Sequence, residues 1–286
     1  MNDGIKKKKN VISFMNMKGG VGKTTLCVNL ADCLAQYLGL RVLIVDMDPQ
    51  FNATQYLLKH EYYLDELFPY EKTIKSIFKT KEIDSNVLNG VVLNEEEKIE
   101  GHIEKVRENL YLICGDLRMI YLSDRSPKLE NRLKKYINNE GIRDNFDFIF
   151  IDCPPTYSIY TIAAFNASDY YILPVKPDFL SVLGINLFQQ TLSNLNDDDH
   201  KLECLGMVFT LVQDYPYIRT KMADLKERYP FYAFSKFMKQ STEVLNNAEK
   251  NICLYNTSFK SDIMELTDEF VQRYQNETGV KIIKNE

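Results

Sequence analysis

Short, wholly apolar runs alternate with amphipathic segments along most of the chain. The apolar runs have the length and uninterrupted hydrophobicity of strands that are buried on both faces. They occupy residues 11–15, 42–45, 110–113, 148–151, 170–173 and 205–211. This alternation of strand and helix predicts an α/β fold in which helices cover both faces of a mostly parallel sheet.

Helical periodicity is clearest between the first two runs. Over Lys23–Leu38 apolar side chains recur on one face, and Gly39 follows as a residue that ends helices. Residues 60–109 are rich in Lys, Glu, Asn and Tyr, and they predict a surface excursion. Because no linker or internal repeat divides the chain, we expect a single domain over residues 1–286. Further helices are predicted at residues 73–80, 128–137, 180–195, 220–228 and 261–274.

Composition and charge restrict the class of protein. The 286 residues are 45% hydrophobic and 26% charged, as in ordinary globular proteins, and the formal net charge is −5. No window resembles a membrane span, and the basic residues 6–9 are not followed by the apolar core of a signal peptide. We therefore expect a cytoplasmic protein without membrane contact. The six cysteines form no C-x-x-C pair and the three histidines are scattered, so neither residue type indicates a metal site.

A glycine-rich segment lies between the first apolar run and the first helix. It consists of Lys18, Gly19, Gly20, Val21, Gly22, Lys23, Thr24 and Thr25. A strand, turn and helix in this order form a phosphate cradle from backbone N–H groups and the helix dipole. Lys23 would reach the β- and γ-phosphates, and the Thr24 hydroxyl would ligate Mg²⁺. Met17 stands where the ordinary phosphate-loop pattern has glycine, and Lys18 is an additional lysine.

Carboxylates follow two later apolar runs. Asp46 and Asp48 come after residues 42–45, and Asp152 comes after residues 148–151. Ligand-binding groups of open α/β sheets gather beyond the carboxyl ends of the strands, although Asp and Pro also simply close strands into turns. A carboxylate at the end of a buried strand holds Mg²⁺, usually through water. We predict that Asp46 and Asp152, together with Thr24, form a metal site.

These motifs resemble those of the ParA/MinD family of dimerising ATPases, and most closely its small partition members. Residues 16–25 are similar to the family's deviant Walker A motif, residues 46–54 to its Walker A′ segment, and residues 151–155 to Walker B. The resemblance spans nearly the whole chain and implies a Rossmann-like P-loop NTPase fold that binds ATP and Mg²⁺. Phe51 replaces a glycine common in the family, which predicts a different local backbone. Beyond Gly206 the match is loose and assigns no adenine contacts.

The resemblance also implies roles for individual residues. Lys18 would cross a homodimer interface to the partner subunit's nucleotide, so that ATP joins two subunits. Lys23 would hold phosphates, and Thr24 and Thr25 would hold phosphates and Mg²⁺. Asp48 would position the attacking water. Lys18, Lys23 and Asp48 are thus the implied catalytic residues, with Asp152 supporting the metal.

Three branches of the family remain to be separated. An electron donor of the nitrogenase-reductase type needs cysteines that bridge a cluster, and Cys114 and Cys153 lie in no such motif. A MinD-like membrane ATPase needs a basic amphipathic C-terminal helix, whereas residues 275–286 contain few apolar side chains. A DNA-partition ATPase is therefore favoured. The alternative is a membrane-associated or protein-cargo-positioning ATPase.

A local excess of basic residues supports contact with DNA. Residues 215–240 carry six basic side chains against two acidic ones, although a solvated face also explains such a run. The phosphate loop begins within twenty residues of the start, so we expect no N-terminal helix-turn-helix domain and no sequence preference. The resemblance implies a nucleoid-associated dimer whose slow hydrolysis a ParB-like centromere-binding protein stimulates. Our candidate DNA contacts are Arg219, Lys221, Lys236 and Lys239.

Overall fold

A seven-stranded sheet forms the centre of the protein. The computed structural model describes residues 8–79, 99–121, 127–139, 141–196 and 201–284. The strand order is β3-β4-β2-β5-β1-β6-β7, and all neighbouring strands are parallel except β3 and β4. The strands are β1 (Val11–Phe14), β2 (Val42–Asp46), β3 (Glu104–Arg107), β4 (Leu110–Ile113), β5 (Phe148–Asp152), β6 (Tyr170–Val175) and β7 (Glu203–Phe209).

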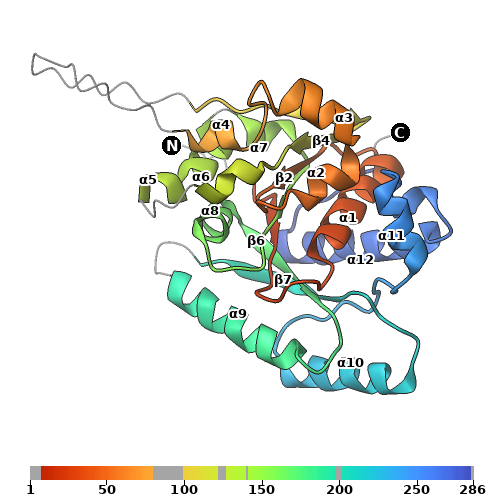
Figure 1. Ribbon diagram of the computed structural model, residues 1–286. Helices are drawn as coiled ribbons and strands as arrows, with labels where there is room; N and C mark the ends of the chain where they lie inside the picture. The colour runs from red at the N-terminus through yellow and green to blue at the C-terminus, as the bar shows by residue number, and fades with distance from the viewer. Residues whose placement is uncertain (1–7, 80–98, 122–126, 140, 197–200, 285–286) are drawn as a thin grey trace, which may run out of the picture.

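Helices cover both faces of this sheet (Figure 1). One face is covered by α1 (Lys23–Leu38), α2 (Asn52–Leu57), η1 (Tyr63–Leu67), α11 (Thr242–Glu249), η3 (Leu254–Asn256) and α12 (Lys260–Thr278). The other is covered by α4 (Lys75–Phe78), α5 (Pro127–Glu130), α6 (Arg132–Asn139), α7 (Ile142–Asn145), α8 (Ile159–Ala167), α9 (Ser181–Leu195) and α10 (Pro216–Arg228). The shorter α3 (His60–Tyr62) and η2 (Leu117–Tyr121) lie in connections.

The apolar runs form strands because their alternate side chains serve two separate cores. Leu43 and Val45 of β2 belong to the core on one face, and Val42 and Ile44 belong to the core on the other. All four side chains are fully buried. A strand in this position needs apolar residues at every position, which explains why these runs do not alternate with polar residues.

The structure confirms the α/β fold with a mostly parallel sheet and the helix Lys23–Leu38. The single helix predicted at residues 128–137 is instead two, α5 and α6. The described part of residues 60–109 is more than a surface excursion, since Ile77 and Phe78 are buried and β3 extends the sheet. Residues 80–98 of that segment lie outside the described residues. Across the described helices, none is long and apolar enough to cross a bilayer.

An aromatic cluster fixes α12 against the sheet. The ring of Phe270 lies 5.3 Å from that of Phe148 and 5.7 Å from that of Phe150, and Tyr274 lies 4.8 Å from Phe148. We expect Phe270→Ala to lower the free energy of unfolding by about 3–5 kcal/mol, because it leaves a cavity among these rings. Urea unfolding followed by circular dichroism measures this value.

The matched control is Gln272→Ala, on the exposed side of the same helix. Its effect should stay within about 0.5 kcal/mol. A loss of equal size in both variants would contradict the role of the aromatic cluster.

Candidate nucleotide-binding site

The glycine-rich segment connects β1 to the start of α1. Gly20 and Gly22 have φ values of 67° and 77°, a left-handed conformation that glycine adopts readily. Thr210 lies just beyond β7, and its hydroxyl donates a hydrogen bond to the carbonyl of Val21 in the loop. The loop therefore presents its backbone and the first turn of α1 to the same side, as a phosphate site requires.

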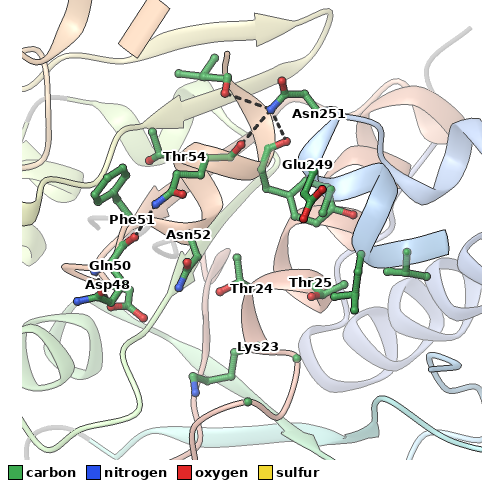
Figure 2. Close-up of a pocket in the computed structure, with 18 of the residues that line it drawn as sticks. Lys23, Thr24, Thr25, Asp48, Gln50, Phe51, Asn52, Thr54, Glu249 and Asn251 are labelled. Carbon is green, nitrogen blue, oxygen red and sulfur yellow. Dashed lines mark hydrogen bonds between the residues drawn. The ribbon is translucent and has the colours of Figure 1, made fainter. Parts of the chain in front are cut away.

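A cavity of about 680 Å³ opens beside this loop. Figure 2 shows Lys23, Thr24 and Thr25 on one wall, with Asp48 and Gln50 on another. The Lys23 ammonium is largely buried and donates to the carbonyl of Lys18 at 3.1 Å. Burial lowers the pKa of Lys23, and the charge of Asp152 opposes this effect. A buried ammonium close to backbone N–H groups suits a polyanion such as a triphosphate.

Two fully buried carboxylates lie side by side behind the cavity. Asp46 and Asp152 are the last residues of β2 and β5 and are direct partners in the strand register. The Thr24 hydroxyl donates to Asp152 Oδ2 at 2.7 Å, while the Thr54 amide and hydroxyl donate to Asp46 Oδ2 at 2.8 and 2.7 Å. Within the described residues, Oδ1 of each aspartate is buried without a hydrogen-bond partner.

Burial sets the protonation of this pair. It raises the pKa of Asp152 to about 7, although the Thr24 hydrogen bond and the charge of Lys23 act in the opposite direction. Burial and the neighbouring Asp152 raise the pKa of Asp46 as well. A divalent cation would relieve both effects, because it favours the ionised carboxylates and prefers oxygen ligands.

The residues present fit Mg²⁺ bound together with a phosphate. Thr24 and Asp152 would hold the ion, with Asp46 behind them. The described part of the chain contains no cluster of three or more His, Cys, Asp or Glu side chains that forms a metal site by itself. Mg²⁺ is commonly held by one or two protein oxygens plus water and phosphate, so this small donor set is the expected one.

Asp48 lies on the opposite wall of the cavity from Thr24 (Figure 2). Its Oδ1 accepts a hydrogen bond from the Gln50 amide at 2.9 Å, which fixes the carboxylate in the turn before α2. Its charge raises the pKa of Asp152, so the two carboxylates share one electrostatic environment. A carboxylate in this position can accept a proton from a water molecule or orient it.

Phe51 adopts the left-handed backbone conformation that glycine favours, with φ 42° and ψ 41°. A non-glycine residue in this region is strained, and such strain needs support from surrounding contacts. The Phe51 ring stacks on Tyr63 with 5.2 Å between ring centroids, and the Tyr63 hydroxyl donates to the Gly115 carbonyl at 3.1 Å. These contacts support the strained turn that precedes α2.

The Lys18 side chain lies against α9 and the segment just before it. Its ammonium forms a salt bridge with Asp178, with Nζ 2.6 Å from Oδ2. Burial opposes ionisation of Asp178, but the hydrogen bonds and charge of Lys18 prevail and lower its pKa. Gly184 of α9 permits this approach, because a Cβ there would lie 3.3 Å from that of Lys18. The additional lysine is therefore held by its own chain in this structure.

The far end of the cavity is formed by residues that the sequence did not single out. Val244, Leu245, Ala248 and Glu249 of α11 line it, together with Asn251 just beyond that helix. Their distance from the phosphate loop in the sequence, and the absence of a motif in residues 242–251, left no signal for this role. Val244, Leu245 and Ala248 provide the apolar surface that a base would need.

The candidate DNA contacts lie outside this cavity. Arg219 pairs with Asp214, and both side chains are exposed. Lys236 and Lys239 pair with Glu265 and Asp262 of α12, acidic residues that the window 215–240 did not include. The Lys221 ammonium lies 5.8 Å from the centroid of the Tyr217 ring. The basic excess of this segment is thus partly balanced by α12.

The fold and the site define a phosphate-loop nucleotide-binding protein. A family model described as an AAA domain (AAA_31) matches residues 9–204. The sporulation initiation inhibitor protein Soj of Bacillus subtilis is 32% identical over 206 residues, which cover 71% of this chain and 72% of Soj. The virulence plasmid ParA family protein pGP5-D of Chlamydia psittaci is 27% identical over 267 residues, which cover 90% of this chain and 93% of that protein. The chain belongs to the ParA/MinD family of P-loop ATPases.

Solved structures share the same fold. A putative plasmid partition protein from Borrelia burgdorferi B31, bound to AMPPNP, has a TM-score of 0.72 at 22% identity, covering 94% of this chain and all of that one (100%). Cobyrinic acid a,c-diamide synthase from Mycobacterium smegmatis, with a bound ATP analog and magnesium, has a TM-score of 0.67 at 20% identity, covering 98% and 100%. At this identity the likeness shows the fold alone.

We expect the buried carboxylate of Asp152 to lower the folding stability of the metal-free protein, although the same carboxylate would hold Mg²⁺. Its pKa is about 7 in the folded protein against an ordinary 3.8, so the folded state binds more protons between these pH values and loses stability as the pH rises through them. Asp152→Asn removes this penalty. In metal-free buffer at pH 8 the variant should gain up to about 4 kcal/mol in free energy of unfolding, at about 1.4 kcal/mol per pKa unit.

Urea unfolding in the presence of a chelator measures this gain. The difference between variant and wild type should shrink as the pH falls from 8 to 4. A variant that is less stable than wild type at pH 8 would show that Asp152 is not held in an unfavourable ionised state.

Proposed function

We propose that this protein is a Mg²⁺-dependent ATPase that forms a homodimer with ATP and, in that state, binds duplex DNA without sequence preference. With a ParB-like centromere-binding partner it would segregate plasmid or chromosomal DNA on the nucleoid, as one cytoplasmic ATPase domain over residues 1–286. The observation that carries the proposal is the convergence of Lys23, Thr24 and Asp48 on one cavity, with the buried Asp152 behind it in hydrogen-bond contact with the Thr24 hydroxyl.

Each side chain has a distinct task in hydrolysis. The loop amides and Lys23 bind the phosphates and stabilise the charge that develops on them. Bound Mg²⁺ would supply further charge neutralisation at the β- and γ-phosphates. Thr24 and Asp152 would hold this ion, while Asp48 would orient a water molecule and accept its proton. The Asp48 turn is fixed in advance by its hydrogen bond from Gln50.

The surface next to Lys18 supports dimer formation. An apolar stripe on and before α9 is exposed, with Phe179 at 85% and Leu183 at 66%, and Leu180 and Leu187 continue it. Exposed apolar patches of this kind mark interaction sites. Because α9 packs against Lys18 through Gly184, a second subunit on this stripe would lie within reach of Lys18. The Lys18–Asp178 salt bridge would then exchange for contact with the partner's nucleotide.

DNA binding rests on the basic side chains of α10 and the segment after it. Figure 1 shows α9 and α10 at one side of the molecule, and one groove is lined by both helices. A dimer formed along α9 would bring two copies of α10 to one surface, which doubles the local positive charge. The alternative output, positioning of a protein cargo or a membrane-bound complex, uses the same ATP switch with another partner.

The proposal predicts nucleotide-dependent DNA binding. Binding to an arbitrary duplex, followed by fluorescence anisotropy, should be strong with Mg²⁺-ATP and weak with ADP or without nucleotide. Affinity should fall steeply with salt, because bound cations are released from DNA phosphates. Lys221→Ala should reduce the slope of log affinity against log salt by about one, whereas Lys135→Ala on α6 should leave it unchanged.

Equal DNA affinity in all nucleotide states would contradict the switch. ATP-dependent binding to liposomes without DNA binding would favour the membrane alternative.

Two substitutions separate hydrolysis from dimerisation. Asp48→Ala should bind ATP but hydrolyse it roughly 100-fold more slowly or worse, because the water loses its base. This variant should accumulate as an ATP-bound dimer. Lys18→Ala should remain monomeric with ATP, and Lys135→Ala, on the surface away from the cavity, should behave as wild type. Phosphate release and light scattering measure the two properties. Normal hydrolysis by Asp48→Ala would refute the role of Asp48 in activating water. A normal ATP-bound dimer of Lys18→Ala would refute the role of Lys18 at the dimer interface.

A further inference from the structure

Asn251 joins the ends of two helices at the rim of the cavity. It follows α11 in a left-handed conformation with φ 57°, and its backbone N–H donates to the Ala248 carbonyl at 3.1 Å. Its side-chain Nδ2 lies 2.9, 3.2 and 3.1 Å from the carbonyl oxygens of Gln55, Tyr56 and Leu58 (Figure 2). These carbonyls belong to the C-terminal end of α2, where helix geometry leaves acceptors without partners.

Ending α11 in the left-handed conformation does not by itself require asparagine. Glycine ends a helix in the left-handed conformation at least as well. Asparagine adds the amide that holds the end of α2, nearly two hundred positions earlier in the sequence. Asn251 therefore links the end of α11 to the end of α2 through hydrogen bonds to three carbonyls.

Hydrogen bonds continue from α2 to Asp48. The backbone carbonyl of Gln55 accepts from Asn251, and the side chain of the same residue donates through Nε2 to the Gln50 backbone carbonyl at 3.0 Å. The Gln50 amide donates to Asp48 Oδ1 at 2.9 Å. Because α2 has six residues and a length of about 9 Å, a hold on its C-terminal end also restrains the turn at its start.

The α11 side of the link faces the cavity. Val244, Leu245 and Ala248 line the same cavity as Thr25 and Asp48. The phosphate end of this cavity is polar, whereas these side chains are apolar and suit the flat face of a base. Leu245 is 63% exposed, so a base placed there would cover it.

We propose that Asn251 is a positioning residue that couples occupation of the base end of the cavity to the placement of Asp48. This inference rests on the proposed ATPase function. A nucleoside bound against α11 restrains that helix, Asn251 transmits the restraint to α2, and Gln55 and Gln50 fix the Asp48 carboxylate. A bare triphosphate fills only the phosphate loop and leaves this path unrestrained. The base thereby contributes to the rate of hydrolysis as well as to binding.

The test compares Mg²⁺-ATP with inorganic triphosphate in wild type and Asn251→Gly. Glycine can keep the left-handed backbone conformation, so the substitution removes the side-chain amide but not the end of the helix. In wild type, kcat should be higher for ATP than for triphosphate. In the variant this advantage in kcat should fall by roughly tenfold, while the lower KM for ATP persists because α11 is intact. Asn256→Ala is the control, since Asn256 is exposed and its side-chain amide donates a long hydrogen bond of 3.4 Å to Gln36 Oε1, away from α2 and Asp48.

A second variant and a second measurement make the outcome independent of one substitution. Gln55→Ala removes the next link, so its loss of kcat should not add to that of Asn251→Gly in the double variant. Hydrogen exchange of residues 52–58 should slow more with AMPPNP than with triphosphate in wild type, and equally with both in Asn251→Gly.

The inference is overturned if Asn251→Gly slows both substrates by the same factor, leaves both unchanged, or adds its effect to that of Gln55→Ala. A wild-type protein that binds AMPPNP but does not hydrolyse ATP would instead refute the proposed function, and hydrogen exchange would still test the link.

Discussion

The juxtaposition of Asp46 and Asp152 is the constraint on which the rest of the site depends. Parallel pairing of β2 and β5 places both carboxylates at one edge of the sheet, fully buried and adjacent in register. Burial alone disfavours their charge, and their mutual repulsion adds to it. Hydrogen bonds and the ammonium of Lys23 offset part of this energy. A bound cation would relieve the unfavourable energy that remains, and a cation in that position would attract phosphate.

Helices α1 and α2, which donate hydrogen bonds to these carboxylates, also position the phosphate loop and the Asp48 turn. Thr24 contacts Asp152 from the first turn of α1, which places the phosphate loop. Thr54 contacts Asp46 from α2, which places the turn containing Asp48. A ligand that changes the charge state of the pair therefore acts on both sides of the cavity. This arrangement links phosphate binding to water positioning within one small region.

Much of this could be predicted from the sequence, because local rules decide it. Buried strands need continuous apolar runs, and a phosphate loop needs its glycines and lysines in a fixed order. The antiparallel strand β3 escaped prediction because three of its four residues are charged and it lies at the edge of the sheet. The role of Asn251 and the pairing of Lys236 with Glu265 depend on residues distant in sequence, which no window can reveal.

The most direct test of the account is the thermal unfolding midpoint with Mg²⁺ alone, ATP with a chelator, and both together. If the buried carboxylates form half of a metal site that phosphate completes, Mg²⁺ and ATP together should raise the midpoint by several degrees more than the sum of their separate effects, as linkage requires. An equal rise with ATP and chelator would contradict the account, because nucleotide binding would then proceed without a cation at Asp152.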